Sequence, residues 1–235
     1  MFESAREEML SRIKGALGSE RPSAPLAVSD DDEQSARRIN EKCDEKRGDL
    51  ITQFEKELRA IGGHFYSAAD ADAACEYVLR LAPAGTKTVG WDCQIIREIG
   101  LADSFKQAGV EFVSDAKEKA AGDFLQRAIE ADVGVTAVDY ALADTATLVV
   151  LTGRGRARVA SLLPPIHVAL VRPAQIISGL SDLFPLLRAE KDFSNQSMSS
   201  AVTFITGPSR TADIELTLVV GVHGPQHLHV ILLND

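Results

Sequence analysis

The chain has 235 residues, of which 45% are hydrophobic and 25% charged, as expected for a globular α/β domain with or without an appended arm and not for a disordered chain. The net charge is −9 and no basic run is present, so broad nucleic-acid binding is not expected. No apolar run is long enough to span a membrane, and the N-terminal residues do not have the pattern of a secretory signal. The three cysteines have the spacing of neither a disulfide framework nor a metal-cluster site. We therefore expect the protein to act in a reducing cytoplasm.

The first 60 residues predict two solvated helices. They hold 25 charged residues, whereas the last 102 residues hold 15. Apolar residues at helical spacing predict a first helix over about 2–17 and a second over about 31–61, which Ser29 or Asp30 can cap. Only the C-terminal half of the second helix has a continuous apolar stripe. We therefore expect its front half to project or to dock on another chain.

After residue 63, short apolar strands alternate with helices. Strands are expected at 64–66, 86–91, 110–114, 133–138, 145–153 and 167–172. Four helices are expected between and after these strands. The first is capped by Ser67 and ends before Pro83, and the second is interrupted and ends at Gly109. The other two cover 123–131 and about 174–187. This alternation predicts a parallel or mixed sheet with helices on each side.

Three apolar strands close the chain, at 201–207, 214–222 and 228–233. The links between them are too short for helices, so we expect hairpins or an antiparallel edge. The predicted fold class is therefore α/β, a three-layer α/β/α domain with a mixed, mostly parallel sheet. We divide the chain into an N-terminal helical arm, residues 1–63, and an α/β domain, residues 64–235.

One glycine-rich segment, GRGRARV at 153–159, has arginines at alternate positions. It resembles a loop that grasps phosphate, but it is not a complete nucleotide-binding motif. The alternative is a solvated loop between a strand and a short helix, and we favour that interpretation.

Three histidines lie within seven residues near the C-terminus, at His223, His227 and His229. They would need a carboxylate such as Asp213 or Glu215 to complete a divalent-metal site, and the spacing fixes no fourth ligand. We favour the alternative, in which one histidine caps a turn and the others form hydrogen bonds across strands, and so predict no metal site.

Two polar corners are candidates for ligand binding. In the first, Asp139, Asp144 and Thr145 lie between two apolar strands, where they can line a pocket or cap a helix. In the second, Gly207 and Pro208 end the strand at 201–206, which we take as buried.

We predict that the second corner binds a small carboxylate or phosphate through Ser209, Arg210 and Thr211, with Asp139, Asp144, Thr145 and His223 nearby. Ligands of open α/β sheets bind beyond the carboxyl ends of strands. Arg210 can hold such an anion with two parallel hydrogen bonds. The alternative is that Arg210 pairs with Asp213 or Glu215 and braces its loop. No catalytic residue is assigned.

At these corners the sequence resembles a known family. TAVDYALADTATLVVL, ARVASLLPPIHVALV, ITGPSRTADIE and GVHGPQHLHVILL are similar to segments of the lactate-utilisation protein C family, which is built on the LUD domain. The resemblance is clear over about residues 85–235 and looser over the N-terminal arm. Usual members have a Glu-Thr-Gly-Thr run where this chain has Asp144-Thr145-Ala146-Thr147.

The resemblance implies a fold like that of sugar-phosphate isomerases and CoA transferases. It also implies a role in oxidising L-lactate to pyruvate, so that lactate serves as a carbon source, beside iron–sulfur partner proteins. The larger LUD-containing partner carries cysteine-rich cluster motifs. This chain has none and so resembles the small, cluster-free subunit, with no intrinsic cofactor.

Two functions therefore remain open. The chain is a subunit of a lactate-oxidising oxidoreductase assembly, contributing an anion site or a docking surface, or it is a stand-alone protein that binds a small anion, CoA or a nucleotide. The fold cannot decide between them, because it supports many chemistries.

Overall fold

A computed structural model describes residues 2–16, 28–115, 121–153, 155–189, 201–212 and 218–234. Within these ranges the core is a six-stranded sheet with the order β1-β12-β7-β4-β2-β3, and every neighbouring pair is parallel. Its strands are β1 (His64–Ala68), β2 (Lys87–Gly90), β3 (Glu111–Ser114), β4 (Val133–Ala137), β7 (Ile166–Val171) and β12 (His227–Leu233). The central strands β4 and β7 are buried along nearly their whole length, as strands covered on both faces must be.

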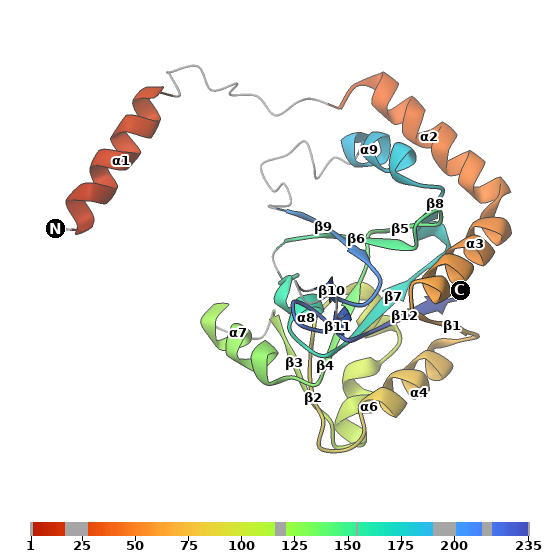
Figure 1. Cartoon of the computed structure of the whole chain (residues 1–235). Coiled ribbons are helices and arrows are strands. Elements are labelled where there is room, and N and C mark those ends of the chain that lie inside the picture. Colours follow the sequence, from red (N-terminus) through yellow and green to blue (C-terminus); the bar gives the residue numbers. More distant parts are fainter. Residues whose placement is uncertain are drawn as a thin grey trace.

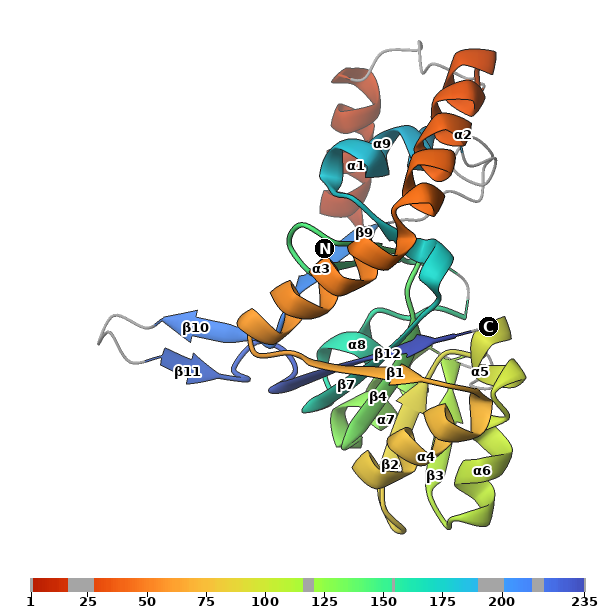
Figure 2. The same ribbon diagram turned by 90° about the vertical axis from the view of Figure 1, so that its right-hand side faces the viewer.

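Helices cover both faces of this sheet (Figures 1 and 2). The helices on one face are α4 (Ala71–Leu81), α5 (Gln94–Glu98) and α6 (Leu101–Gln107), and those on the other are α7 (Ala121–Glu130) and α8 (Val159–Leu162). The α4 helix begins at Asp70, whose side chain accepts a hydrogen bond from the N–H of Ala73. The prediction that Ser67 caps this helix is wrong, because β1 continues through Ser67 to Ala68. The α/β/α class itself is confirmed.

A second, four-stranded sheet has the order β8-β5-β6-β9. Its strands are β5 (Tyr140–Leu142), β6 (Thr147–Leu151), β8 (Ile176–Ile177) and β9 (Val202–Thr206). The β6 strand is antiparallel to both β5 and β9. Figure 2 shows the projecting hairpin of β10 (Arg210–Ala212) and β11 (Leu218–Val220), which is also antiparallel. The β8 strand pairs with β5 in parallel, so this smaller sheet is mixed, whereas the six-stranded sheet has only parallel pairs among the described residues.

Three sequence expectations for the C-terminal third need correction. The last strand, β12, does not join an antiparallel edge but lies inside the parallel sheet between β1 and β7. The expected helix at 174–187 begins later, because a 3₁₀ turn at Pro173–Gln175 and the short strand β8 precede α9 (Leu180–Ala189). The strand expected to be buried at 201–206 is instead an edge strand, which among the described residues pairs only with β6, and Phe204 is 45% exposed. The polar composition of KDFSNQSMSS at 191–200 predicts a loop, and this segment lies outside the described residues.

The predicted second helix is two helices, α2 (Asp30–Glu45) and α3 (Arg47–Ala60), which meet at Lys46. Ser29 caps α2 with a full capping box, as predicted. The front half does not project freely, because α2 packs along α9 (Figure 1). The small side chains of Ala36 and Cys43 are buried on α2. An ion pair between Arg188 and Asp32, at 3.1 Å, joins α9 to α2 at the protein surface.

The α3 helix belongs to the hydrophobic core. Leu50, Phe54 and Leu58 recur at helical spacing and are buried. The ring centroid of Phe54 lies 6.2 Å from that of Phe65 on β1. The first helix, α1 (Phe2–Ala16), agrees with the prediction and lies apart from the body in Figure 1. None of the described residues forms a helix long and apolar enough to cross a membrane.

Candidate functional site

The path of the chain around β2 creates a crevice at the carboxyl ends of the parallel strands. The β2 strand lies between β3 and β4, so the chain moves outward from β2 to β3 and then back across β2 to β4. Because such crossovers are right-handed, the helices that follow β2 and β3 lie on opposite faces. Open α/β sheets bind their ligands at this kind of reversal, beyond the strand ends.

A cavity of about 520 Å³ opens at this position, and we call it the strand-end cavity. Its walls come from the segments after β2, β4 and β7 and from the loop before α8. The polar or ionisable side chains that line it include those of Cys93, Glu98, Asp139, Arg156, Arg172 and Gln175. Two arginines and two carboxylates thus share one cavity.

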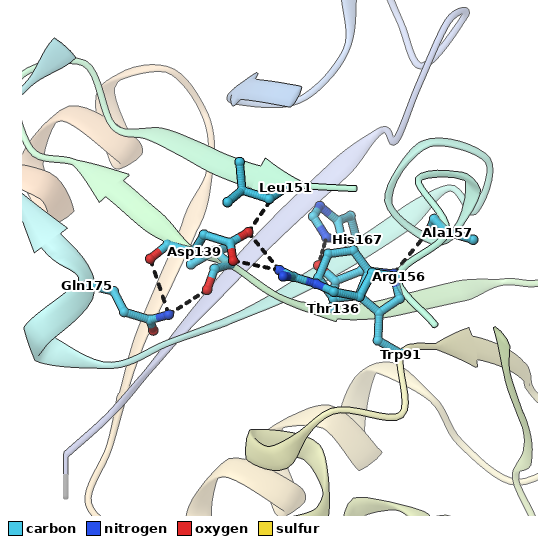
Figure 3. A network of polar contacts seen from close by, with 9 residues as sticks. Trp91, Thr136, Asp139, Leu151, Arg156, Ala157, His167 and Gln175 are labelled. Atoms are coloured by element: carbon cyan, nitrogen blue, oxygen red, sulfur yellow. Dashed lines mark hydrogen bonds and ion pairs between the residues drawn. The ribbon is translucent and has the colours of Figure 1, made fainter. Parts of the chain in front are cut away.

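Arg156 is held in one orientation by an ion pair and an aromatic ring (Figure 3). Its Nη2 donates to Asp139 Oδ1 and Oδ2 at 2.8 and 2.7 Å. Asp139 Oδ2 also accepts the backbone N–H of Leu151 at 2.7 Å. The guanidinium Cζ lies 4.6 Å from the ring centroid of Trp91, which is buried and whose Nε1 donates to the carbonyl of Ala157. Among the described residues these bonds engage only Nη2 of the guanidinium, so its other N–H groups can serve a ligand.

Arg172 forms the second, more accessible ion pair of the cavity. Its Nη2 pairs with Oε2 of Glu98, and the side chains are 30% and 40% exposed. The Asp139 side chain, by comparison, is 17% exposed. Gln175 joins the ends of β7 and β4, because its Oε1 accepts the N–H of Arg172 and its Nε2 donates to the carbonyl of Val138. An incoming anion can therefore replace the exposed Glu98 carboxylate on a cation whose backbone is fixed.

Cys93 lines the same cavity but is not an activated nucleophile. Burial raises the pKa of its thiol, and this effect outweighs the lowering by the N–H of Ile96 and by Arg156 and Arg97. The thiol form therefore predominates at neutral pH, and the thiolate is the reactive form. The cavity is thus suited to binding and orienting an anion rather than to attack by sulfur.

The loop predicted to bind an anion lines a second cavity, of about 470 Å³. Ser209, Arg210 and His223 line this cavity together, whereas Thr211 pairs with Val219 in the β10–β11 hairpin. The argument from strand ends was wrong for this loop, because β9 is not part of the parallel sheet. Arg210 Nη2 donates to the carbonyl of Ile61, at the end of α3, at 2.6 Å. This bond supports a bracing role, although with a different partner from those considered; Asp213 and Glu215 lie outside the described residues.

The remaining predicted residues are distributed differently. Asp139 lines the strand-end cavity and not the loop cavity. Asp144 lies against Gly179, just before α9, and Thr145 Oγ1 donates to Asp144 Oδ1. Thr147 links this corner to Thr206 in the loop cavity through side-chain hydrogen bonds of 2.9 Å to Thr145 and 2.7 Å to Thr206. The corner and the loop are thus connected, but Asp144 and Thr145 do not line either cavity.

Ala146 is the one non-glycine residue with a positive φ in the described part of the chain. Its φ is +50°, in the left-handed region that disfavours residues with a side chain by roughly 1 kcal/mol or more. Its methyl group is fully buried, which offsets part of that cost. The turn therefore holds alanine in a backbone conformation that glycine favours.

The histidines make ring contacts at the start of β1 and β12. The His229 ring stacks on that of His64 at 4.3 Å, and Tyr77 Oη lies 2.9 Å from His229 Nδ1. Burial, with a smaller contribution from His64 and His227, lowers the pKa of His229 to about 4. His223 lies apart, in the loop cavity. In the described part of the chain no three His, Cys, Asp or Glu side chains are grouped to hold a metal ion.

The residues that sequence reasoning missed are Trp91, Arg156, Arg172 and Gln175. Arg156 belongs to the glycine-rich segment that was interpreted as a solvated loop. That interpretation is wrong for Arg156, whose side chain turns inward onto Asp139 and Trp91. Arg172 directly follows an apolar strand, and this placement at a predicted strand end is the one signal that could have identified it.

Comparisons with known proteins agree with this architecture. The LUD domain family model matches residues 51–233. A protein named lactate utilization protein C from Bacillus licheniformis is 30% identical over 98% of this chain and 96% of its own length. Another of the same name, from Halalkalibacterium halodurans, is 36% identical over 63% of this chain and 62% of its own length. The crystal structure of a DUF162 family protein from Deinococcus radiodurans matches with a TM-score of 0.54 at 19% identity, covering 80% of this chain and 98% of that one.

Proposed function

Because this chain belongs to the LUD domain family, and its relatives are named for lactate utilisation, we propose that it serves in lactate utilisation by binding a small carboxylate. The observation that carries the proposal is the pair of arginines in the strand-end cavity. Arg156 and Arg172 come from different loops and meet at the sheet position where α/β proteins bind ligands. Lactate and pyruvate both offer a carboxylate that a guanidinium can hold with two hydrogen bonds.

The two cations have different parts in this proposal. Arg172 exchanges Glu98 for the ligand carboxylate, because that ion pair is the more exposed. Arg156 keeps Asp139 as its partner and offers its other N–H groups to the ligand. Asp139, fixed by Arg156 and by Leu151, is the acceptor for a ligand hydroxyl. The cavity would thereby recognise a carboxylate that carries a neighbouring hydroxyl group.

We further propose that electrons from lactate pass through iron–sulfur partner proteins and that this chain acts in the cytoplasm. An iron–sulfur cluster is commonly held by four cysteine thiolates. This chain has three cysteines, and two of them, Cys43 and Cys75, are buried on separate helices. The donor set does not fit a cluster. In the alternative proposal the chain works alone and binds CoA or a nucleotide, and a tight complex of the isolated chain with either ligand would favour it.

Growth on L-lactate tests the proposed function. We expect deletion of the gene to stop or strongly slow growth of the host on L-lactate but not on glucose. The wild-type gene should restore growth, whereas a gene with Arg172→Ala should not, because loss of a charge-assisted bond lowers ligand affinity roughly 10- to 100-fold. Arg127→Ala is the matched control, because Arg127 forms an exposed ion pair with Glu111 on α7 and β3, outside the cavity.

The outcomes separate function from site. Normal growth of the deletion strain on lactate contradicts the proposed function. Full restoration by the Arg172→Ala gene, with protein levels equal by immunoblot, leaves the function intact and contradicts the assignment of the strand-end cavity.

A further inference from the structure

The outermost strand of the second sheet, β9, has one edge that no described strand pairs with. The sheet order β8-β5-β6-β9 leaves β9 with β6 as its neighbour on one side only (Figure 1). The register pairs Thr152 with Ala201, and the N–H of Thr152 donates to the Ala201 carbonyl. In an antiparallel pair, hydrogen-bonded and non-hydrogen-bonded residue pairs alternate. The register therefore shows which backbone groups of β9 face away from β6.

Those groups belong to Val202, Phe204 and Thr206. Thr203 and Ile205 occupy the hydrogen-bonded positions opposite Val150 and Leu148, so the N–H and C=O groups of the other three residues point outward. Among the described residues, none donates to or accepts from these outward groups. Unpaired backbone groups of this kind are a template for another strand.

The edge also lacks the features by which proteins protect such strands. The sequence of β9, VTFIT, has no charge and no proline. Phe204, at its centre, is 45% exposed. The loop cavity lies beside this strand and is walled by Leu162 of α8, which is 36% exposed. An uncharged strand edge and an exposed apolar surface are therefore adjacent.

We propose that this edge pairs with the same strand of a second copy of the chain, so that the four-stranded sheets of two molecules become one continuous sheet. The three outward-facing residues are symmetric about Phe204. An antiparallel partner centred on Phe204 of the second copy places each Val202 opposite a Thr206. Every outward N–H and C=O of these residues then has a partner, and a two-fold axis passes between the two Phe204 residues.

The surface around the edge favours a second copy over an unrelated strand. A two-fold axis perpendicular to the sheet places α8 of both copies on the same face. Leu162, which lines the cavity beside β9, is then covered by the strand of the other molecule. The backbone edge and the apolar flank are thus satisfied by one symmetric contact.

A pair of substitutions at Phe204 separates the backbone contribution from that of the side chain. Phe204→Pro removes both the ring and the outward N–H, whereas Phe204→Ala removes the ring and keeps the N–H. Neither should break the β6–β9 ladder, because this N–H faces away from β6. By sedimentation velocity over a wide concentration range, we expect a reversible wild-type dimer and a dissociation constant at least about 100-fold larger for the proline variant than for the alanine variant.

Opposite charges at the same position test the two-fold geometry and remain decisive if the proline variant does not fold. Phe204→Lys and Phe204→Glu each place like charges directly opposite each other in the proposed dimer, which disfavours pairing. Each variant alone should be monomeric, and an equimolar mixture should recover the dimer. Circular dichroism and thermal melting confirm that each variant is folded.

Three results would overturn the proposal. They are a wild-type chain that stays monomeric at every concentration, a dimer that the proline variant forms as tightly as the alanine variant, and lysine and glutamate variants that dimerise alone as well as they do together.

Discussion

Replacing Gly134 by alanine should lower the free energy of unfolding by about 3 kcal/mol. Overpacking a core usually costs about 1–3 kcal/mol, so this substitution should be among the most costly of its kind. A Cβ at this position of β4 would lie 1.8 Å from the carbonyl oxygen of Ala160 and 3.1 Å from Pro164 Cγ. The first of these is a backbone atom, so α8 must move away from the sheet. The movement should also shift Ala157, which accepts the Trp91 indole N–H, and so weaken ligand binding in the strand-end cavity.

Chemical denaturation followed by circular dichroism measures this effect. Gly48→Ala is the matched control, because Gly48 lies in α3 and a Cβ there meets nothing within 4 Å. That variant should gain up to about 1 kcal/mol from the higher helix propensity of alanine. If Gly134→Ala changed the free energy of unfolding as little as Gly48→Ala does, the close packing of α8 on β4 would be contradicted.

Removing residues 1–63 should abolish cooperative unfolding, whereas removing residues 1–27 should leave it nearly unchanged. The longer deletion takes away α3, with Leu50, Phe54 and Leu58, all buried in the core. Truncation of one such side chain typically costs 2–5 kcal/mol, and the total stability of a domain is only about 5–15 kcal/mol. The shorter deletion removes α1, on which Met9, Leu10 and Ile13 are exposed.

Thermal melting of the two truncated chains, with near-ultraviolet circular dichroism as a measure of packing, decides this prediction. A chain of residues 64–235 that melts cooperatively would support the division at residue 63 that the charge distribution suggests. A chain of residues 28–235 that fails to fold would show that α1 is needed for stability.

The sequence predicted most strands and helices but not how the strands are shared between sheets. Both β6 and β7 read as continuous apolar runs, and they lie in different sheets. An apolar run reports burial and carries no information on which strand is its neighbour. The same limit explains β12, whose proximity in sequence to β11 suggested a hairpin although its partners are β1 and β7.

The packing of α2 on α9 and the composition of the strand-end cavity could not be predicted from the sequence, for related reasons. The α2 helix packs on α9 with small buried residues, Ala36 and Cys43, which form no visible apolar stripe. Asp139 was singled out because it lies at a polar corner, but its partner Arg156 follows 17 residues later in a glycine-rich loop. The local pattern around Arg156 fits a solvated loop equally well. Only the folded chain brings the two side chains and Trp91 together.

Titration of the purified chain with L-lactate and pyruvate by isothermal calorimetry tests the central claim most directly, with Arg172→Ala and Arg210→Lys measured beside the wild type. We expect the wild type to bind and Arg172→Ala to lose at least about tenfold in affinity. Arg210→Lys should bind as the wild type does, because Arg210 braces Ile61 outside the strand-end cavity. Equal affinity of Arg172→Ala and the wild type, or loss of binding in Arg210→Lys at unchanged thermal stability, would contradict the account and place the anion in the loop at 207–211.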